Sequence, residues 1–171
     1  MTLPPLDGQG LLPVGRHATD PQELHDVFVD GAPSHKSLRE DLLAAYLVWS
    51  VRVHQCFGPG RVWLGDTFAT HWVEDPALRV CFFPAQPIMA EKALTSGDSA
   101  MGLLTLEDVI YSTPSPGGHI TQMKAVGGML DASLGIDELA TDVDLLMSLV
   151  VGRRPGRPPL AAVTGYCELR I

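Results

Sequence analysis

The sequence lacks most of the features that would assign it to a common class of protein. Its three cysteines stand at the uneven positions Cys56, Cys81 and Cys167, which excludes a disulfide framework and a paired-cysteine zinc motif. No apolar stretch, including residues 145–151, which Ser148 interrupts, approaches the roughly 20 residues that a membrane-spanning helix needs. The N-terminus has no charged start followed by an apolar run, so we expect no signal peptide. These absences predict a cytoplasmic protein with no membrane partner.

Basic residues are also scarce. The chain has 12 lysines and arginines against 20 acids, which gives a net charge of −8. Such a chain is a poor candidate for general binding of nucleic acid, so we expect its partners to be other protein chains in a homo- or hetero-oligomeric assembly. One basic turn, residues 152–159, carries Arg153, Arg154 and Arg157, which are candidate contact residues.

Length and composition indicate one globular domain. With 171 residues, 46 % of them apolar and 19 % charged, the chain can build a single core. Residues 1–19 are rich in proline and glycine, and we expect an extended N-terminal arm that packs through Leu3, Leu6, Leu11 and Leu12. Residues 20–171 then form the domain.

Periodicity within that domain predicts both helices and strands. Leu38, Leu42, Tyr46, Trp49 and Val53 recur at spacings of three and four, and Ser37 with Glu40 resembles a capping box, so the longest helix is expected over 37–56. Further helices are predicted over 21–29, 86–95, 105–110 and 137–150, strands over 62–64, 78–83 and 129–134, one or two more strands within 160–171, and a loop over 112–118. The order predicts an α+β (α/β-like) fold, with helices flanking a small mixed β-sheet.

Catalytic motifs with a known mechanism are missing. The sequence has no P-loop, no dinucleotide-binding GxGxxG, no HExxH and no GxSxG. Its six histidines are scattered, so a metal site made from them would require a fold that gathers them. We therefore expect no metal and no cofactor.

Four separated segments resemble, in the same order, an uncharacterised family of small proteins with a minimal nucleotidyltransferase fold. They are LLPVGRHAT at 11–19, VWLGDTFATH at 62–71, GLLTLEDV at 102–109 and GGMLDA at 127–132. The resembling family occurs in bacteria and in phages, including phages of actinobacteria. The resemblance implies a minimal nucleotidyltransferase-like fold for this chain.

The chemistry that the resemblance implies is metal-assisted nucleotidyl transfer. A Gly-Ser turn approaches the phosphates, while two carboxylates on one strand and a third on a neighbour hold divalent cations. In this sequence Asp66 and Thr67 replace the Gly-Ser pair, and Leu78 and Val80 stand at the expected positions of the paired carboxylates. Asp131 alone matches the third carboxylate. The resemblance therefore implies a degenerate site with no catalytic residue.

We expect a non-catalytic structural or interaction protein, phage-encoded, as a particle component of the head–tail or tail region or as an accessory protein in the host cytoplasm. Trp72 is the predicted exposed contact, and its replacement by alanine is expected to leave folding largely intact. One alternative is a metal-dependent nucleotidyltransferase or nucleotide-binding regulator with atypical ligands, which would be Asp66, Glu74, Asp75 and Asp131, with Arg79 on phosphate. Another is an antitoxin-like or immunity-like partner protein.

Overall fold

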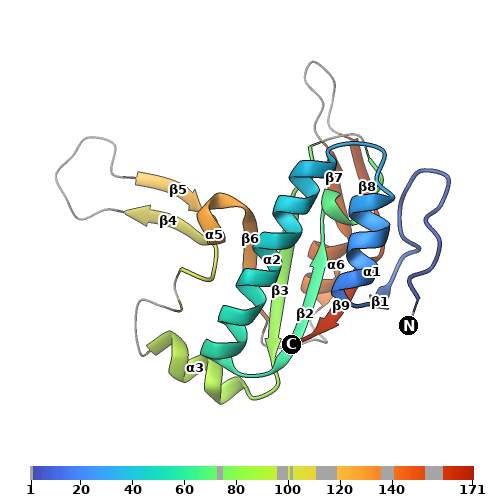
Figure 1. Cartoon of the computed structure of the whole chain (residues 1–171). Coiled ribbons are helices and arrows are strands. Elements are labelled where there is room, and N and C mark those ends of the chain that lie inside the picture. The colour runs from blue at the N-terminus through green and yellow to red at the C-terminus, as the bar shows by residue number, and fades with distance from the viewer. Residues whose placement is uncertain are drawn as a thin grey trace.

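The fold is α+β, as predicted, and its centre is a five-stranded mixed sheet (Figure 1). The computed structural model describes residues 2–72, 75–95, 100, 102–110, 119–135, 141–152 and 160–171. The sheet has the strand order β1-β9-β2-β3-β6, with β1 Arg16–Ala18, β2 Gly60–Gly65, β3 Leu78–Pro84, β6 Leu130–Leu134 and β9 Tyr166–Arg170. Strand β2 runs antiparallel to both β3 and β9, whereas β1 is parallel to β9 and β6 is parallel to β3.

Two smaller hairpins and a set of helices complete the described structure. The hairpins are β4 Leu106–Ile110 with β5 His119–Met123, and β7 Leu149–Gly152 with β8 Leu160–Val163. The helices are α1 Pro21–His25, α2 Lys36–Phe57, α3 Pro87–Thr95, α5 Ala125–Gly128 and α6 Thr141–Ser148, with a π-helical turn η1 Asp26–Asp30 and a 3-10 turn η2 Thr67–Ala69. No helix in the described part of the chain is long and apolar enough to cross a membrane.

Helix α2 confirms the predicted longest helix to within one residue at each end. The capping box is not formed, because the helix begins one residue earlier, after His35 in the left-handed conformation with φ 58°. At the other end Gly58 has φ 79°, and its N–H donates to the His54 carbonyl at 2.9 Å. This glycine lets the chain turn directly from α2 into β2.

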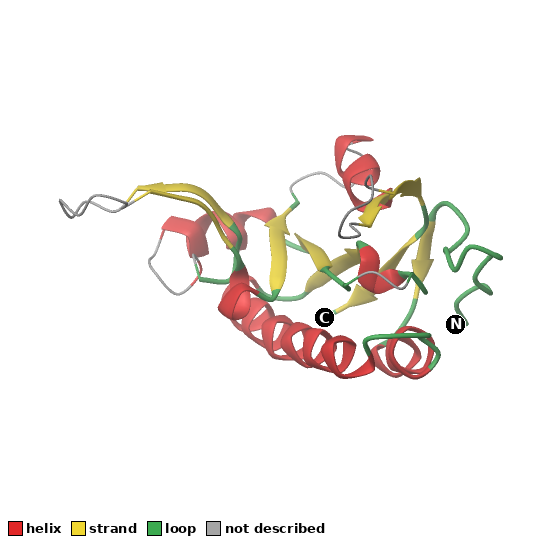
Figure 2. Cartoon of the chain, turned by 90° about the horizontal axis from the view of Figure 1, so that it is seen from above, coloured by secondary structure: helices red, strands yellow, loops and turns green. Residues whose placement is uncertain are grey.

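The core lies on both faces of the central sheet. Helices α1 and α2 cover one face (Figure 2), where Trp49 and Phe57 of α2 belong to the same buried cluster as Val80 and Phe82 of β3. The other face carries a second cluster, which consists of Trp63, Cys81, Phe83, Met147 and Tyr166. Side chains alternate along a strand, so β2 and β3 supply both clusters.

The N-terminal arm packs on the domain as predicted. Leu3, Leu11 and Leu12 are buried, and Leu6 packs against the core while partly exposed. The arm also adds β1 to the sheet, beside β9. Gly165 is needed for this close approach, since a Cβ at that position would lie 2.1 Å from the Pro13 carbonyl oxygen.

Two predicted helices differ from the structure. Residues 106–110, expected to be helical, form strand β4, which pairs with the next strand, β5. The helix expected over 137–150 ends at Ser148, and residues 149–152 form β7 because β8 supplies a partner strand. Both errors have the same physical cause: a short segment adopts the strand conformation when the following segment pairs with it in a hairpin. The predicted loop at 112–118, and residues 136–140 of the second helix, lie outside the described residues.

One buried tyrosine leads to a prediction about stability. The Tyr46 hydroxyl has no hydrogen-bond partner among the described residues, and burial raises the pKa of this side chain. Because an unpaired buried hydroxyl is costly, Tyr46→Phe should raise the free energy of unfolding by about 1 kcal/mol, measured by urea denaturation. Tyr166→Phe is the matched control, since the Tyr166 hydroxyl donates to Asp144 and its removal should destabilise the protein. A destabilised Tyr46→Phe variant would contradict this prediction.

Candidate functional site

The turn after β2 has the backbone of a glycine turn, although it carries an aspartate. Asp66 has φ 74° and ψ −168°, a conformation that glycine adopts far more readily than other residues. The Asp66 carboxylate accepts a hydrogen bond from the Thr67 backbone N–H at 2.8 Å. The turn therefore has a backbone conformation that favours glycine, and the Asp66 carboxylate occupies the Thr67 N–H.

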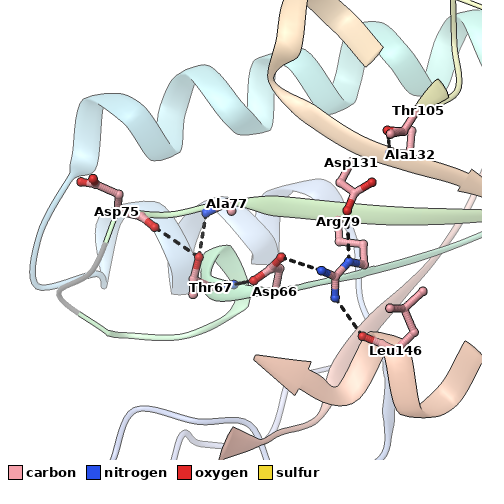
Figure 3. Close-up of polar contacts among 9 residues, drawn as sticks. All are labelled: Asp66, Thr67, Asp75, Ala77, Arg79, Thr105, Asp131, Ala132 and Leu146. Atoms are coloured by element: carbon pink, nitrogen blue, oxygen red, sulfur yellow. Dashed lines mark hydrogen bonds and ion pairs between the residues drawn. The ribbon is translucent and has the colours of Figure 1, made fainter. Parts of the chain in front are cut away.

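The Thr67 hydroxyl is fully used inside the protein. It donates to the Asp75 backbone carbonyl at 3.3 Å and accepts from the Ala77 N–H at 2.7 Å (Figure 3). The residue is only 3 % exposed. Thr67 therefore joins the turn to the segment that leads into β3.

The Arg79 side chain connects the turn after β2 to strand β6 and to helix α6. Its Nη2 lies 3.3 Å from Asp66 Oδ2, and its Nε lies 3.4 Å from Asp131 Oδ2. Its Nη1 donates to the Leu146 carbonyl of α6 at 2.9 Å (Figure 3). The parallel register of β3 and β6 places Arg79 beside Asp131. We call Asp66, Arg79 and Asp131 the Arg79 cluster.

The Arg79 cluster is largely shielded from solvent. The side chains of Asp66, Arg79 and Asp131 are 14 %, 21 % and 30 % exposed. Burial raises the pKa of the Asp66 carboxyl, and the nearby Arg79 guanidinium and Thr67 N–H only partly oppose this rise. Since the folded state binds the Asp66 proton more tightly than the unfolded state does, this group favours folding in acid. Its contribution is lost as the pH rises through the raised pKa.

Leu78 and Val80, which were expected at this site, lie on the other face of the sheet. They are 1 % and 0 % exposed and belong to the cluster packed under α2. The alternation along β3 instead places Arg79 and Cys81 on the face that carries Asp131. The sequence signal that identifies the correct face is Arg79 itself, the one charged residue in an otherwise apolar strand.

A cavity opens beside the Arg79 cluster. Its volume is about 470 Å³, and its polar lining comes from Arg79, Thr105, Asp131 and Ser133. The Thr105 hydroxyl accepts from the Ala132 N–H at 2.8 Å, so this part of the lining is fixed to β6. These four polar residues therefore line one cavity beside β6.

The alternative set of metal ligands is not assembled in the described structure. Glu74 lies outside the described residues, and the Asp75 side chain is 89 % exposed, with its carboxylate 3.6 Å from His35 Nδ1. Figure 3 shows the Asp75 carboxylate directed away from Asp66. Asp66 and Asp131 are therefore joined by Arg79 and not by a further acid.

Trp72 is not the exposed contact that the sequence predicted. It is 7 % exposed and packs in a small cluster with Leu11 and Val150. The chain folds back onto the N-terminal arm at this point, where the His71 N–H donates to the Gly10 carbonyl at 2.8 Å. The other contact candidates, Arg153, Arg154 and Arg157, lie outside the described residues.

The chain belongs to a family of unknown function, DUF6932, whose model matches residues 4–128. This match covers the arm, α1, α2, β2, β3 and both Asp66 and Arg79 of the Arg79 cluster, but ends before Asp131. Comparison with curated proteins gave no match, and comparison with solved structures gave none. No nucleotidyltransferase family matched, so the resemblance to that fold stays a prediction.

Proposed function

We propose that this protein is a non-catalytic interaction protein, in which the Arg79 cluster replaces a metal and nucleotide site by an internal ion-pair network. The observation that carries the proposal is the position of the Arg79 guanidinium between the Asp66 and Asp131 carboxylates. A divalent cation shared by these two carboxylates would have to displace an arginine that is always protonated at neutral pH.

The turn after β2 supports the same proposal, because its polar groups are not available to bind a triphosphate. A triphosphate at this turn would meet the Asp66 carboxylate, which already accepts the Thr67 N–H. The Thr67 hydroxyl is held by Asp75 and Ala77. The Thr67 N–H, the Thr67 hydroxyl and the Asp66 carboxylate at this turn therefore already have internal partners.

The Arg79 cluster has a structural role of its own under this proposal. Arg79 connects β3 to the turn after β2, to β6 and to the last turn of α6. Ion-pair networks of this kind fix the relative positions of elements more than they add net stability. A place in a phage particle and an immunity-like role rest on the resemblance alone and stay predictions.

The proposal is tested by attempting to restore a metal site. The wild-type protein should show no rise in melting temperature with Mn²⁺, alone or with each of the four ribonucleoside triphosphates. Arg79→Asp removes the internal cation and adds a third carboxylate beside Asp66 and Asp131, so Mn²⁺ should raise the melting temperature of this variant. A ligand at 100 times its Kd stabilises a fold by about 2.7 kcal/mol, which a thermal melt resolves easily.

Two controls make the result specific. Arg79→Gln removes the cation without adding a carboxylate, and it should respond to Mn²⁺ less than Arg79→Asp does. Adding Asp131→Asn to Arg79→Asp should abolish the response. A rise in the melting temperature of the wild-type protein with Mn²⁺ and a nucleotide would overturn the proposal and favour the enzyme alternative.

A further inference from the structure

The outer face of α2 carries an apolar stripe that no described part of the chain covers. Ala44, Leu47, Val48 and Val51 are all exposed, at the spacing that places them on one side of a helix. The exposed fractions of Leu47, Val48 and Val51 are 41 %, 59 % and 56 %. Figure 2 shows α2 at the outside of the molecule, with the sheet on its other side.

Charged residues border this stripe, with acids at its N-terminal end and bases at its C-terminal end. Two acids, Glu40 and Asp41, precede it, and two basic residues, Arg52 and His54, follow it. At 100° per residue Asp41 and Arg52 fall on one flank of the stripe and His54 falls on the other. Glu40 lies one turn before Ala44, within the width of the stripe and on the side of Leu47. Within the described residues, none of these four side chains makes a hydrogen bond or an ion pair. The stripe therefore has acids at its N-terminal end and bases at its C-terminal end, and on one flank Asp41 and Arg52 make the same order.

We infer that the stripe binds a second copy of this chain, with the two α2 helices antiparallel about a two-fold axis between Leu47 and Val48. In this arrangement Ala44 faces the partner's Val51, and Leu47 faces the partner's Val48. A small side chain thus opposes a larger one at the ends of the stripe. The contact is isologous, so every pairing occurs twice.

The charges select this arrangement over others. The two-fold axis brings each flank against the same flank of the second copy. Asp41 then lies beside the partner's Arg52, and Glu40 lies beside the partner's His54. A parallel arrangement would place the acidic ends of the two stripes side by side and the basic ends side by side, and like charges at a contact are unfavourable. Charge complementarity therefore identifies a second copy as the occupant.

This surface is independent of the proposed function. Helix α2 covers the face of the sheet opposite to that of Arg79 and Met147, so a change at the stripe does not touch the Arg79 cluster. Because one stripe of four apolar side chains from each copy makes a small contact, we expect a dimer that dissociates on dilution.

The test measures the oligomeric state of the full chain by sedimentation equilibrium over about two decades of concentration. The wild-type protein should be a reversible dimer. Val48→Glu, in the middle of the stripe, should be monomeric throughout. Val14→Glu is the matched control, because Val14 is 72 % exposed on the N-terminal arm and the substitution is chemically the same. Circular dichroism should show that both variants are folded.

A charge exchange tests the antiparallel arrangement itself. Asp41→Arg and Arg52→Asp should each weaken the dimer by about tenfold or more, because each puts like charges together twice. The double variant should recover dimerisation, and an equimolar mixture of the two single variants should form the heterodimer. A wild-type monomer at every concentration would overturn the inference, as would a dimer that survives Val48→Glu or is lost equally in Val14→Glu. Single charge variants that dimerise like the wild type would overturn the antiparallel assignment.

Discussion

Replacement of Arg39 by alanine is expected to lower the free energy of unfolding by about 4 kcal/mol. Arg39 is 0 % exposed. Its Nη1 donates to the carbonyls of Phe28 at 3.1 Å and Phe68 at 2.7 Å, and its Nη2 donates to the Trp72 carbonyl at 3.4 Å. The alanine variant leaves these three carbonyls without their donor and creates a cavity in the core. Urea denaturation with an unchanged m-value measures the loss.

Two further variants separate the causes of this loss. Burial lowers the pKa of Arg39 to about 10, so the guanidinium remains charged at neutral pH. Arg39→Lys keeps a charge but cannot reach three carbonyls with one planar group, so its loss should be intermediate. Arg170→Ala truncates an exposed arginine and should change the free energy of unfolding by no more than about 0.5 kcal/mol. Equal losses for Arg39→Ala and Arg170→Ala would contradict the assigned role of Arg39.

Replacement of Trp72 by alanine is expected to lower the free energy of unfolding by about 3–5 kcal/mol. Trp72 packs against Leu11 of the arm and Val150 of β7, so its side chain joins three segments that are distant in the sequence. The sequence alone predicts the opposite result, an intact fold, because it treats Trp72 as a surface contact. Thermal melting of the isolated protein distinguishes the two expectations.

The control for Trp72→Ala is an exposed apolar residue of the N-terminal arm, the segment that also holds Leu11. Val14 is 72 % exposed, and Val14→Ala should leave the melting temperature almost unchanged. Trp72→Phe keeps part of the packing and should lie between the wild type and the alanine variant. A loss below about 1 kcal/mol in Trp72→Ala would restore the prediction of a surface role.

In this fold the side chains of Arg39 and Arg79 each connect several structural elements. Arg39 joins α2 to the carbonyls of η1 and of the segment after β2. Arg79 joins β3 to two carboxylates and to the end of α6. Neither role follows from a motif, since each depends on groups that lie far away in the sequence.

The sequence located the candidate turn but not the residues that occupy its site. Gly65, Asp66 and Thr67 follow a short apolar strand, and the structure places the turn there. The sequence assigned Leu78 and Val80 to the site, whereas the structure places Arg79 there. A shift of one residue reverses the face of a strand, and only the pairing of β3 with β2 and β6 determines which face meets Asp131.

Local physical chemistry accounts for what the sequence determined by itself. The 3.6-residue period of α2 and the apolar strands β2 and β3 are encoded in neighbouring residues, as is the burial of the leucines in the arm. Tertiary structure decided the strand state of residues 106–110, the burial of Trp72 and the pairing of Arg79 with Asp66 and Asp131. These features depend on partners outside the segment itself, and the free energy of a strand pair, a buried indole or an ion pair exists only when the chain brings those partners together.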